Sequence, residues 1–533
     1  MTESARSPAR VWQAACSFCG APVSFQSPAS PMAVCTYCRS TLVRDGDTLR
    51  RIGQSASLFD DHSPLSLGAQ GRLQGEAFSL VGRIQWAYRD TDGDEGRWSE
   101  WQLVFDNGRS GCLSEDNGGY VLSFALRLDA PLPDGLKSQP LGSELSLDGR
   151  VWALAARVSA RVHAMEGELL ARPTLSGEVT VVELRNAQGE VLSVEAGSHP
   201  PRADVGRAVQ LADLGLSAGV DTQAPTEGKL KAAGLSCPSC GASLVPTLAQ
   251  TKSIVCGSCH AVVDISKGVG NDLAYYQQDN TLEPLIALGR SGMLTVRGRR
   301  GKWQVVGYQE RCQDATGDDG EQYFWREYLL YHRSEGFAFL VDSEDGWSVV
   351  APMTGVPKGR GDQVDFGGQR FSRIESYTAR TTYVLGEFYW PVRKGQRTLN
   401  TDYRSAGKDP VRVLNLEQSG QEAIWSAGQV LDHKEVMQAF GVTDEQVRLF
   451  KRDAGPSTWS MSTMQVIVIV VVVILLLSLL TRCSDACDDV SERYGPSSTE
   501  YQQCRARAGS SGSGYSGGSG GSYGGYNSGG FHK

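Results

Sequence analysis

The stretch CSFCGAP, residues 16–22, returns as CPSCGAS at residues 237–243. Fifteen residues separate each stretch's second cysteine from another CxxC pair, so a four-cysteine pattern recurs at a constant offset of 221 residues. Two such pairs let four thiolates converge on one tetrahedral metal ion. The sequence therefore predicts two zinc ribbons, each holding one structural Zn²⁺, with the ligands Cys16, Cys19, Cys35, Cys38, Cys237, Cys240, Cys256 and Cys259.

The ribbons are predicted to be structural because four thiolates leave no open position for water or substrate. The alternatives are a redox pair, a metal-free thiol core, degenerate sites without metal, and an iron ion in place of zinc. Nucleic-acid binding is not expected, because it requires a basic footprint. No Lys or Arg lies between Cys16 and Cys38, Lys252 alone lies between Cys237 and Cys259, and the whole chain has a net charge of −8.

The repeat continues beyond the cysteines. WSEWQLVF from Trp98 resembles WREYLLYH from Trp325, and ARVHAMEGELL from Ala160 resembles ARTTYVLGEFY from Ala379. The motif LSVE, which ends at Glu195, returns as LNLE. Because the offset drifts only slightly, the chain is interpreted as a tandem duplication of one module of about 200 residues, too long a period for a solenoid.

Each module begins as a ribbon and continues as a β-rich body. Short alternating runs rich in Val, Trp, Tyr and Phe are separated by Gly, Asp and Asn, a cadence typical of an all-β sandwich or barrel. Helix is expected only after Asp432. The predicted segments are ribbon 1 (1–45), β-body 1 (55–215), a linker (216–235), ribbon 2 (236–266), β-body 2 (272–432), a helical linker (433–453), a transmembrane helix (460–481) and a tail (482–533).

Four carboxylates recur inside the apolar runs of both copies: Glu100, Glu168, Glu327 and Glu387. They are candidates for a binding cleft that holds a small cation. The alternative is that they lie on a solvent face or cap a neighbouring loop. No hydrolase, metalloprotease or nucleotide-binding motif is present, and no histidine recurs between the copies. The chain is therefore expected not to be an enzyme.

The run MQVIVIVVVVILLLSLL, residues 464–480, carries no charge and predicts a single membrane span. Arg448, Lys451 and Arg452 precede it, and three aspartates follow Arg482. The positive-inside rule then places the N-terminal bulk in the cytoplasm and exports the tail. No secretory signal opens the sequence. The tail is a disordered Gly/Ser segment preceded by Cys483, Cys487 and Cys504, whose pairing the sequence leaves open.

The β-bodies resemble a bacterial family known as domain of unknown function 4178. The resemblance is carried by Trp98, Glu100, Trp101, Gly119 and Tyr120 in the first copy, and by Trp325, Glu327, Tyr328, Gly346 and Trp347 in the second. It implies β-rich modules joined to zinc ribbons or membrane spans, with a context of polyamine synthesis or envelope stress. It assigns no catalytic residue.

These observations favour a membrane-anchored, non-enzymatic scaffold at the inner face of the bacterial cytoplasmic membrane, with two zinc ions and a protein partner. Duplication supports this hypothesis, since two linked weak sites gain avidity. The alternative hypothesis is a sensor for a small cationic ligand such as a polyamine, held by the four recurring glutamates.

Overall fold

The computed structural model describes residues 12–451 with short gaps, and seven residues between 493 and 502. The gaps within 12–451 are 28–29, 57–62, 90–94, 117–118, 129–131, 133–134, 176, 197–201, 217–234, 249–250, 266–272, 279–282, 315–321, 334, 360, 407–409 and 444–445. The predicted membrane span at 464–480 and the three tail cysteines lie outside the described residues. Within the described part, no helix has the length and apolar character that a membrane span requires.

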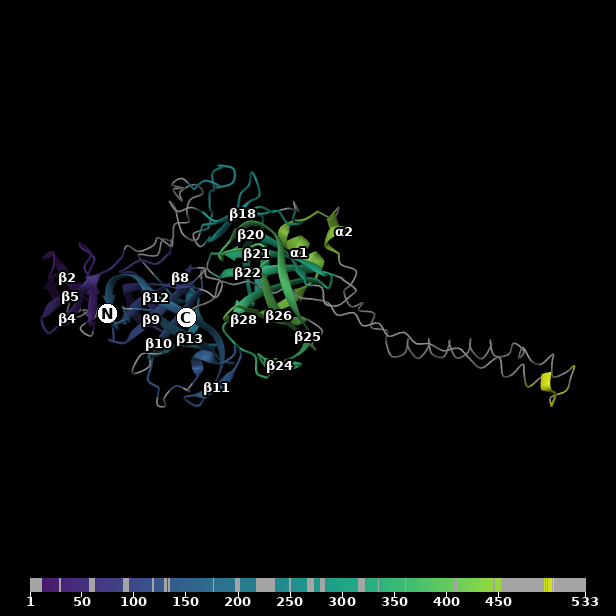
Figure 1. Ribbon diagram of the computed structural model, residues 1–533, viewed down its shortest axis with the longest axis horizontal. Helices are drawn as coiled ribbons and strands as arrows, with labels where there is room; N and C mark the ends of the chain where they lie inside the picture. The colour runs from purple at the N-terminus through teal and green to yellow at the C-terminus, as the bar shows by residue number, and fades with distance from the viewer. Residues whose placement is uncertain are drawn as a thin grey trace, which may run out of the picture. The chain divides into compact units, whose positions relative to one another are not determined.

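The first β-body is a closed antiparallel barrel (Figure 1). Its strands pair in the order β7, β8, β9, β10, β15, β14, β13, β12, and β12 pairs with β7 to close the ring. Two short strands, β6 (Gln70–Leu73) and β11 (Glu144–Leu147), extend it. The ring strands are β7 (Glu76–Arg89), β8 (Glu95–Phe105), β9 (Ser110–Asp116), β10 (Gly119–Leu126), β12 (Arg150–Leu169), β13 (Val179–Arg185), β14 (Glu190–Ala196) and β15 (Arg202–Val209).

The second β-body repeats this pairing strand for strand. Its order is β20, β21, β22, β23, β28, β27, β26, β25, and β25 closes on β20. The short strands β19 (Ser291–Val296) and β24 (Gln363–Phe366) correspond to β6 and β11. The ring strands are β20 (Arg299–Gln313), β21 (Phe324–His332), β22 (Gly336–Ser343), β23 (Gly346–Met353), β25 (Gln369–Phe388), β26 (Arg397–Ser405), β27 (Arg412–Ser419) and β28 (Glu422–Leu431).

Both faces of the ring strands are buried, which explains their near-continuous apolar character. In β21, Trp325 and Leu329 face the barrel interior, whereas Tyr328 and Leu330 pack outward. The outward face is covered by α1 (His433–Phe440) and α2 (Val447–Phe450), so the helix expected after Asp432 is present. In the first copy, the 3₁₀ turn η2 (Leu211–Leu214) contributes Leu214 to the equivalent outer face.

Each ribbon is joined to its own barrel by β-pairing. Ribbon 1 contains β1 (Trp12–Ala15), β2 (Pro22–Phe25), β3 (Met32–Val34), β4 (Ser40–Asp45) and β5 (Thr48–Gln54), and β3 pairs with the end of β12. Ribbon 2 contains β16 (Ser253–Val255), β17 (Val262–Asp264) and β18 (Tyr275–Tyr276), and β16 pairs with the end of β25. Ribbon and barrel therefore form one module, and the chain contains that module twice.

A glycine pair sits where each long strand leaves its barrel for the ribbon. Gly167 pairs with Gly82 in the first copy, and Gly386 pairs with Gly307 in the second. Gly167 and Gly386 have φ angles of +68° and +85°. A Cβ at either would lie 2.3 Å from a backbone oxygen, that of Val81 or Val306. Only glycine permits this left-handed step and this close approach of two backbones.

Replacing Gly386 with Ala is expected to destabilise the second module by about 3 kcal/mol or more, because the strained φ and the clash with Val306 add together. The matched control is Gly395→Ala, where φ is +69° but nothing lies within 4 Å of the new Cβ. That control should lose only about 1 kcal/mol. Thermal and denaturant unfolding would measure both, and equal losses would contradict the role of the close approach.

Candidate metal centres and buried carboxylates

The eight predicted cysteines form two separate groups, in each of which all Sγ atoms lie within 4.8 Å of one another. The Cys16–Cys38 and Cys19–Cys35 Sγ distances are both 3.7 Å. The corresponding distances in ribbon 2 are 3.6 and 3.7 Å. A metal–sulfur bond of about 2.3 Å in tetrahedral geometry places sulfurs about 3.8 Å apart, whereas a disulfide needs about 2.05 Å. Each group can therefore hold a metal ion.

Four similar turns bring the thiols together. In each turn the first cysteine's carbonyl accepts a hydrogen bond from the residue four positions later, at 2.8–2.9 Å. That residue has a left-handed backbone in every case: Gly20, Arg39, Gly241 and His260. Glycine provides this conformation readily in the first turn of each ribbon, and Arg39 and His260 adopt it in the second. The turn positions the two thiols of each CxxC pair side by side.

Local hydrogen bonds favour thiolate at one cysteine of each group. The Ser40 hydroxyl lowers the pKa of Cys38 to about 6, and the Ala261 backbone lowers the pKa of Cys259 to about 6. Metal binding needs deprotonated thiols. A deprotonated ligand is thus available in each ribbon near neutral pH.

Glu168 and Glu387 bind the ribbons rather than a ligand. Glu387 accepts hydrogen bonds from the backbone N–H groups of Thr247 (2.9 Å) and Leu248 (3.1 Å), and from the hydroxyls of Thr247 and Thr251. Glu168 accepts from the N–H groups of Gln26 and Ser27 and from the Ser30 hydroxyl. Both carboxylates are buried. Each follows its strained glycine, which turns the side chain from the barrel to a ribbon loop.

Glu100 and Glu327 lie inside the barrels. Trp98 and Glu100 point to the same side of β8 because residues two apart share a strand face. The Trp98 indole N–H donates to Glu100 at 3.1 Å, and the Trp325 indole donates to Glu327 at 2.6 Å. The recurring W-x-E motif is therefore a buried indole–carboxylate pair, 5% exposed at Glu100 and 0% at Glu327.

The second barrel adds charged groups around this pair. Gln309 donates to Glu327 at 2.6 Å, and Arg311 lies 3.6 Å from Glu327 and 3.4 Å from Glu417. Arg311 and Glu417 come from β20 and β27, which are not neighbouring strands, so their contact crosses the barrel interior. Burial raises the pKa of Glu417 to about 8, although Arg311 opposes this shift. Burial also raises the pKa of Glu327.

Arg311 and Glu417 were not among the predicted site residues. Glu417 did recur as Glu195, and this recurrence was a usable signal. Arg311 gave no such signal, because it does not recur. It lies opposite Trp325 in the second barrel, and the first barrel has Trp86 in the equivalent position opposite Trp98. The four predicted carboxylates do not line one common cleft. Two lie within the barrels, and two attach the ribbons.

The comparison with known families matches each barrel separately. Residues 66–211 and 293–433, which cover both barrels, match the family described as domain of unknown function (DUF4178). The chain belongs to this family. It contains two tandem DUF4178 domains, each preceded by a four-cysteine cluster. No curated protein matches the chain. No solved structure matches it either.

The ribbon-binding carboxylates of this DUF4178 protein can be tested in the two copies side by side. Replacing Glu387 with Gln puts an amide N–H₂ against several donors, so ribbon 2 should open more often. Amide hydrogen exchange in residues 236–265 should accelerate by about tenfold to a hundredfold. Ribbon 1 serves as the internal control.

The reciprocal variant Glu168→Gln should accelerate exchange in residues 12–54 and leave ribbon 2 unchanged. Uniform acceleration across both modules, or none in either ribbon, would contradict the assigned role.

The buried Glu417 predicts a pH dependence. Its pKa is 4.5 without burial and about 8 in the folded protein. Between these pH values the folded barrel keeps a proton that the unfolded chain has lost. Stability should therefore fall as pH rises, by at most about 1.4 kcal/mol per pH unit, and level off above about 8. Replacing Glu417 with Gln should remove this contribution. The stability of the variant relative to the wild type should therefore rise between pH 5 and 8.

Unfolding midpoints measured across this range would show the difference. Glu344→Gln, at an exposed position, is the control and should follow the wild-type pH profile. A constant difference between the Glu417 variant and the wild type would rule out the shifted titration.

Proposed function

We propose that this DUF4178 protein is a membrane-anchored, non-enzymatic scaffold whose two ribbon–barrel modules are stabilised by zinc. The observation that supports it most is the closed donor set of each cysteine group. Four thiolates fill the tetrahedral coordination of Zn²⁺ and leave no position for water or substrate. Such a site stabilises a fold and does not activate a reactant.

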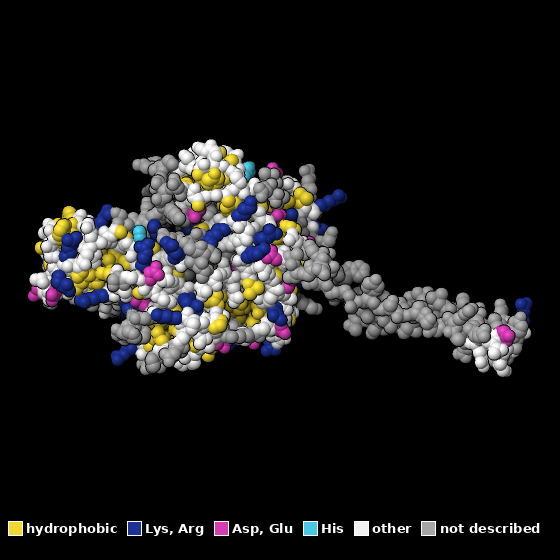
Figure 2. Space-filling model, in the orientation of Figure 1, with side chains coloured by type: hydrophobic (Ala, Val, Ile, Leu, Met, Phe, Trp, Pro, Cys, Tyr) yellow, Lys and Arg dark blue, Asp and Glu magenta, His cyan; other side chains and the backbone are white. Residues whose placement is uncertain are grey.

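Two exposed aromatic side chains support a protein-docking role for ribbon 1. Phe18 and Tyr37 occupy the tips of its two CxxC turns and are 61% and 74% exposed. Ribbon 2 carries Ser239 and Ser258 at these positions. Apolar side chains are visible over β2, β4 and β5 in the space-filling view (Figure 2). Aromatic residues are enriched at interface centres, so we assign the protein partner to ribbon 1.

The membrane anchor in this proposal is the apolar run at 464–480, with Arg448, Lys451 and Arg452 on its cytoplasmic side. The modules would then work at the inner face of the cytoplasmic membrane of a bacterium, with the tail exported. The family resemblance adds an envelope-stress context. A sensor for cationic ligands has less support, because Glu100, Glu168, Glu327 and Glu387 are all bonded within the protein.

The experiment expresses the full chain and a variant lacking 464–480, then measures membrane retention and metal content. The full chain should stay in the membrane fraction with two zinc ions, and the deletion variant should become soluble with zinc unchanged. Cys19→Ser and Cys240→Ser should each lose one zinc ion. Iron in place of zinc, or a membrane-bound deletion variant, would refute the corresponding part of the proposal.

The docking role is tested by crosslinking in membranes, with identification of the crosslinked protein. The double variant Phe18→Ser and Tyr37→Ser gives ribbon 1 the residues that ribbon 2 already carries, so the fold and the zinc content should be retained. Its crosslinks should decrease by at least about tenfold. Unchanged crosslinking would exclude ribbon 1 as the docking element.

A further inference from the structure

A cavity of about 410 Å³ lies where the two barrels meet. Both ribbons and both barrels belong to one compact unit. Its walls come from the β13–β14 hairpin and the end of β15 in the first barrel, and from the hairpins at Arg297, Glu335 and Phe366 in the second. Neither copy alone supplies all its walls, and the volume lies within the range of small-molecule sites.

Hydrogen bonds between the barrels frame the cavity. The Thr354 hydroxyl donates to the Gly189 carbonyl at 3.1 Å, and the Val356 N–H donates to the Asn186 carbonyl at 3.0 Å. At a second contact, the Arg157 N–H donates to the Gln421 carbonyl at 3.1 Å. The first two bonds connect the segment after β23 to the β13–β14 hairpin, and the third connects β12 to the turn between β27 and β28. The cavity is therefore fixed by backbone contacts and does not depend on flexible side chains alone.

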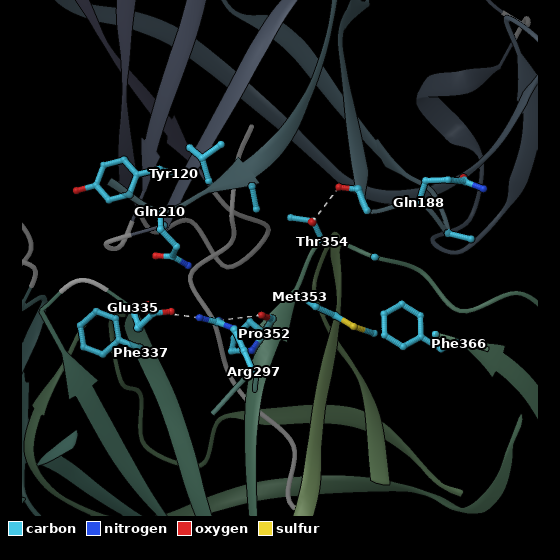
Figure 3. A pocket seen from close by; sticks show the side chains of 18 of the residues that line it. Tyr120, Gln188, Gln210, Arg297, Glu335, Phe337, Pro352, Met353, Thr354 and Phe366 are labelled. Carbon is cyan, nitrogen blue, oxygen red and sulfur yellow. Dashed lines mark hydrogen bonds between the residues drawn. The ribbon is translucent and has the colours of Figure 1, made fainter. Parts of the chain in front are cut away.

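Arg297 supplies a cation to this cavity. Its guanidinium donates to the Glu335 and Pro352 carbonyls, both at 3.0 Å, and lies between these residues in the close-up view (Figure 3). The Glu335 carboxylate is instead paired with Arg299 at 3.2 Å. No carboxylate among the described residues forms an ion pair with Arg297. Desolvation lowers the pKa of Arg297, the charge of Glu335 opposes this shift, and the side chain remains exposed.

The rest of the wall is largely apolar. Phe337, Pro352, Met353, Phe366 and Tyr389 contribute from the second barrel. Met353 and Phe366 lie beside each other on the far side of Pro352 from Arg297, and Gln210 points from the first barrel toward the Arg297 end (Figure 3). The printed hydrogen bonds of the Arg297 guanidinium go to neutral backbone carbonyls. An anionic group of a ligand in the cavity would add a charge-assisted contact that these carbonyls do not supply. The apolar wall selects an apolar ligand body.

The first copy provides a neutral version of the same turn. Gln74 occupies the position of Arg297 in the β6–β7 hairpin, and both residues have a left-handed backbone, with φ of +50° and +51°. The fold therefore does not require a cation at this position. Only the second copy carries a guanidinium at this turn, and there it lines the cavity.

We infer that the cavity between the barrels binds a small amphipathic anion, an aromatic or alkyl carboxylate whose acid group pairs with Arg297 and whose apolar part contacts Met353 and Phe366. This binding site is separate from the metal centres and goes beyond the scaffold function. It also selects the opposite charge from the polyamine-type ligand that the recurring glutamates suggested.

The test uses isothermal titration calorimetry on the full chain in phosphatidylcholine nanodiscs, with empty nanodiscs subtracted. Three probes share one ring system and differ in charge: 2-naphthoate, 2-naphthylmethanol and 2-naphthylmethylammonium. Naphthoate should bind with one site per chain, and at least about tenfold more tightly than the other two. No naphthoate binding, or equal binding of all three probes, would overturn the inference.

Arg297→Gln introduces the residue that the β6–β7 hairpin of the first copy carries at this position, so the turn should be preserved. It should weaken naphthoate binding by about tenfold to a hundredfold and leave the neutral probe unchanged. Arg300→Gln, on the same hairpin but outside the cavity wall, is the matched control and should bind as the wild type does. Unfolding midpoints would establish that both variants are folded. Wild-type affinity in a folded Arg297→Gln variant would overturn the assignment of the cation.

Discussion

The module depends on one constraint, the left-handed glycine that precedes a buried glutamate at the end of each long strand. Gly167 and Gly386 allow two backbones to approach without a Cβ between them. The step turns Glu168 and Glu387 toward ribbon loops, where the carboxylates accept backbone hydrogen bonds. Because charged hydrogen bonds in buried surroundings are strong and costly to leave unmade, the position of the ribbon follows from this step. The four cysteines can then hold a metal ion in a ribbon whose attachment the barrel has already determined.

Much of this architecture could be predicted from the sequence, because the duplication supplied an internal comparison. The recurring cysteines predicted both metal groups, and the alternation of apolar residues predicted a β-rich body. The cadence left a sandwich and a barrel both open, since closure of the ring depends on β12 returning to β7 across the intervening strands. The recurring glutamates stand out in the sequence because they interrupt apolar runs in both copies. Their use was not visible, because Glu168 bonds to Ser27 and Ser30, more than 130 residues earlier in the chain.

Differences between the copies carry information that their similarities do not. Positions that the copies share, such as Glu100 and Glu327, belong to the common fold. Where they differ, a second copy of the same backbone shows that the fold accepts either residue. Phe18 against Ser239, and Arg297 against Gln74, are differences of this kind. Arg311 is less simple, since it occupies the position of Trp86 but is bonded to Glu417 in the interior. It replaces aromatic packing with a polar contact across the barrel.

The contact between the barrels joins unlike surfaces. The first barrel contributes its β13–β14 hairpin and β12, whereas the second contributes the segment after β23 and the turn between β27 and β28. Such a head-to-tail contact leaves the two copies in different surroundings, so each could diverge without affecting its twin. In the second copy, α1 and α2 cover the outer face, and the Trp347 indole donates to the Phe450 carbonyl at 2.9 Å. In the first, Tyr120 holds the position of Trp347, donates to the Glu115 carboxylate at 3.0 Å and also lines the cavity. The duplication thus produced a site that a single module does not contain, and its chemistry depends on residues that only one copy carries.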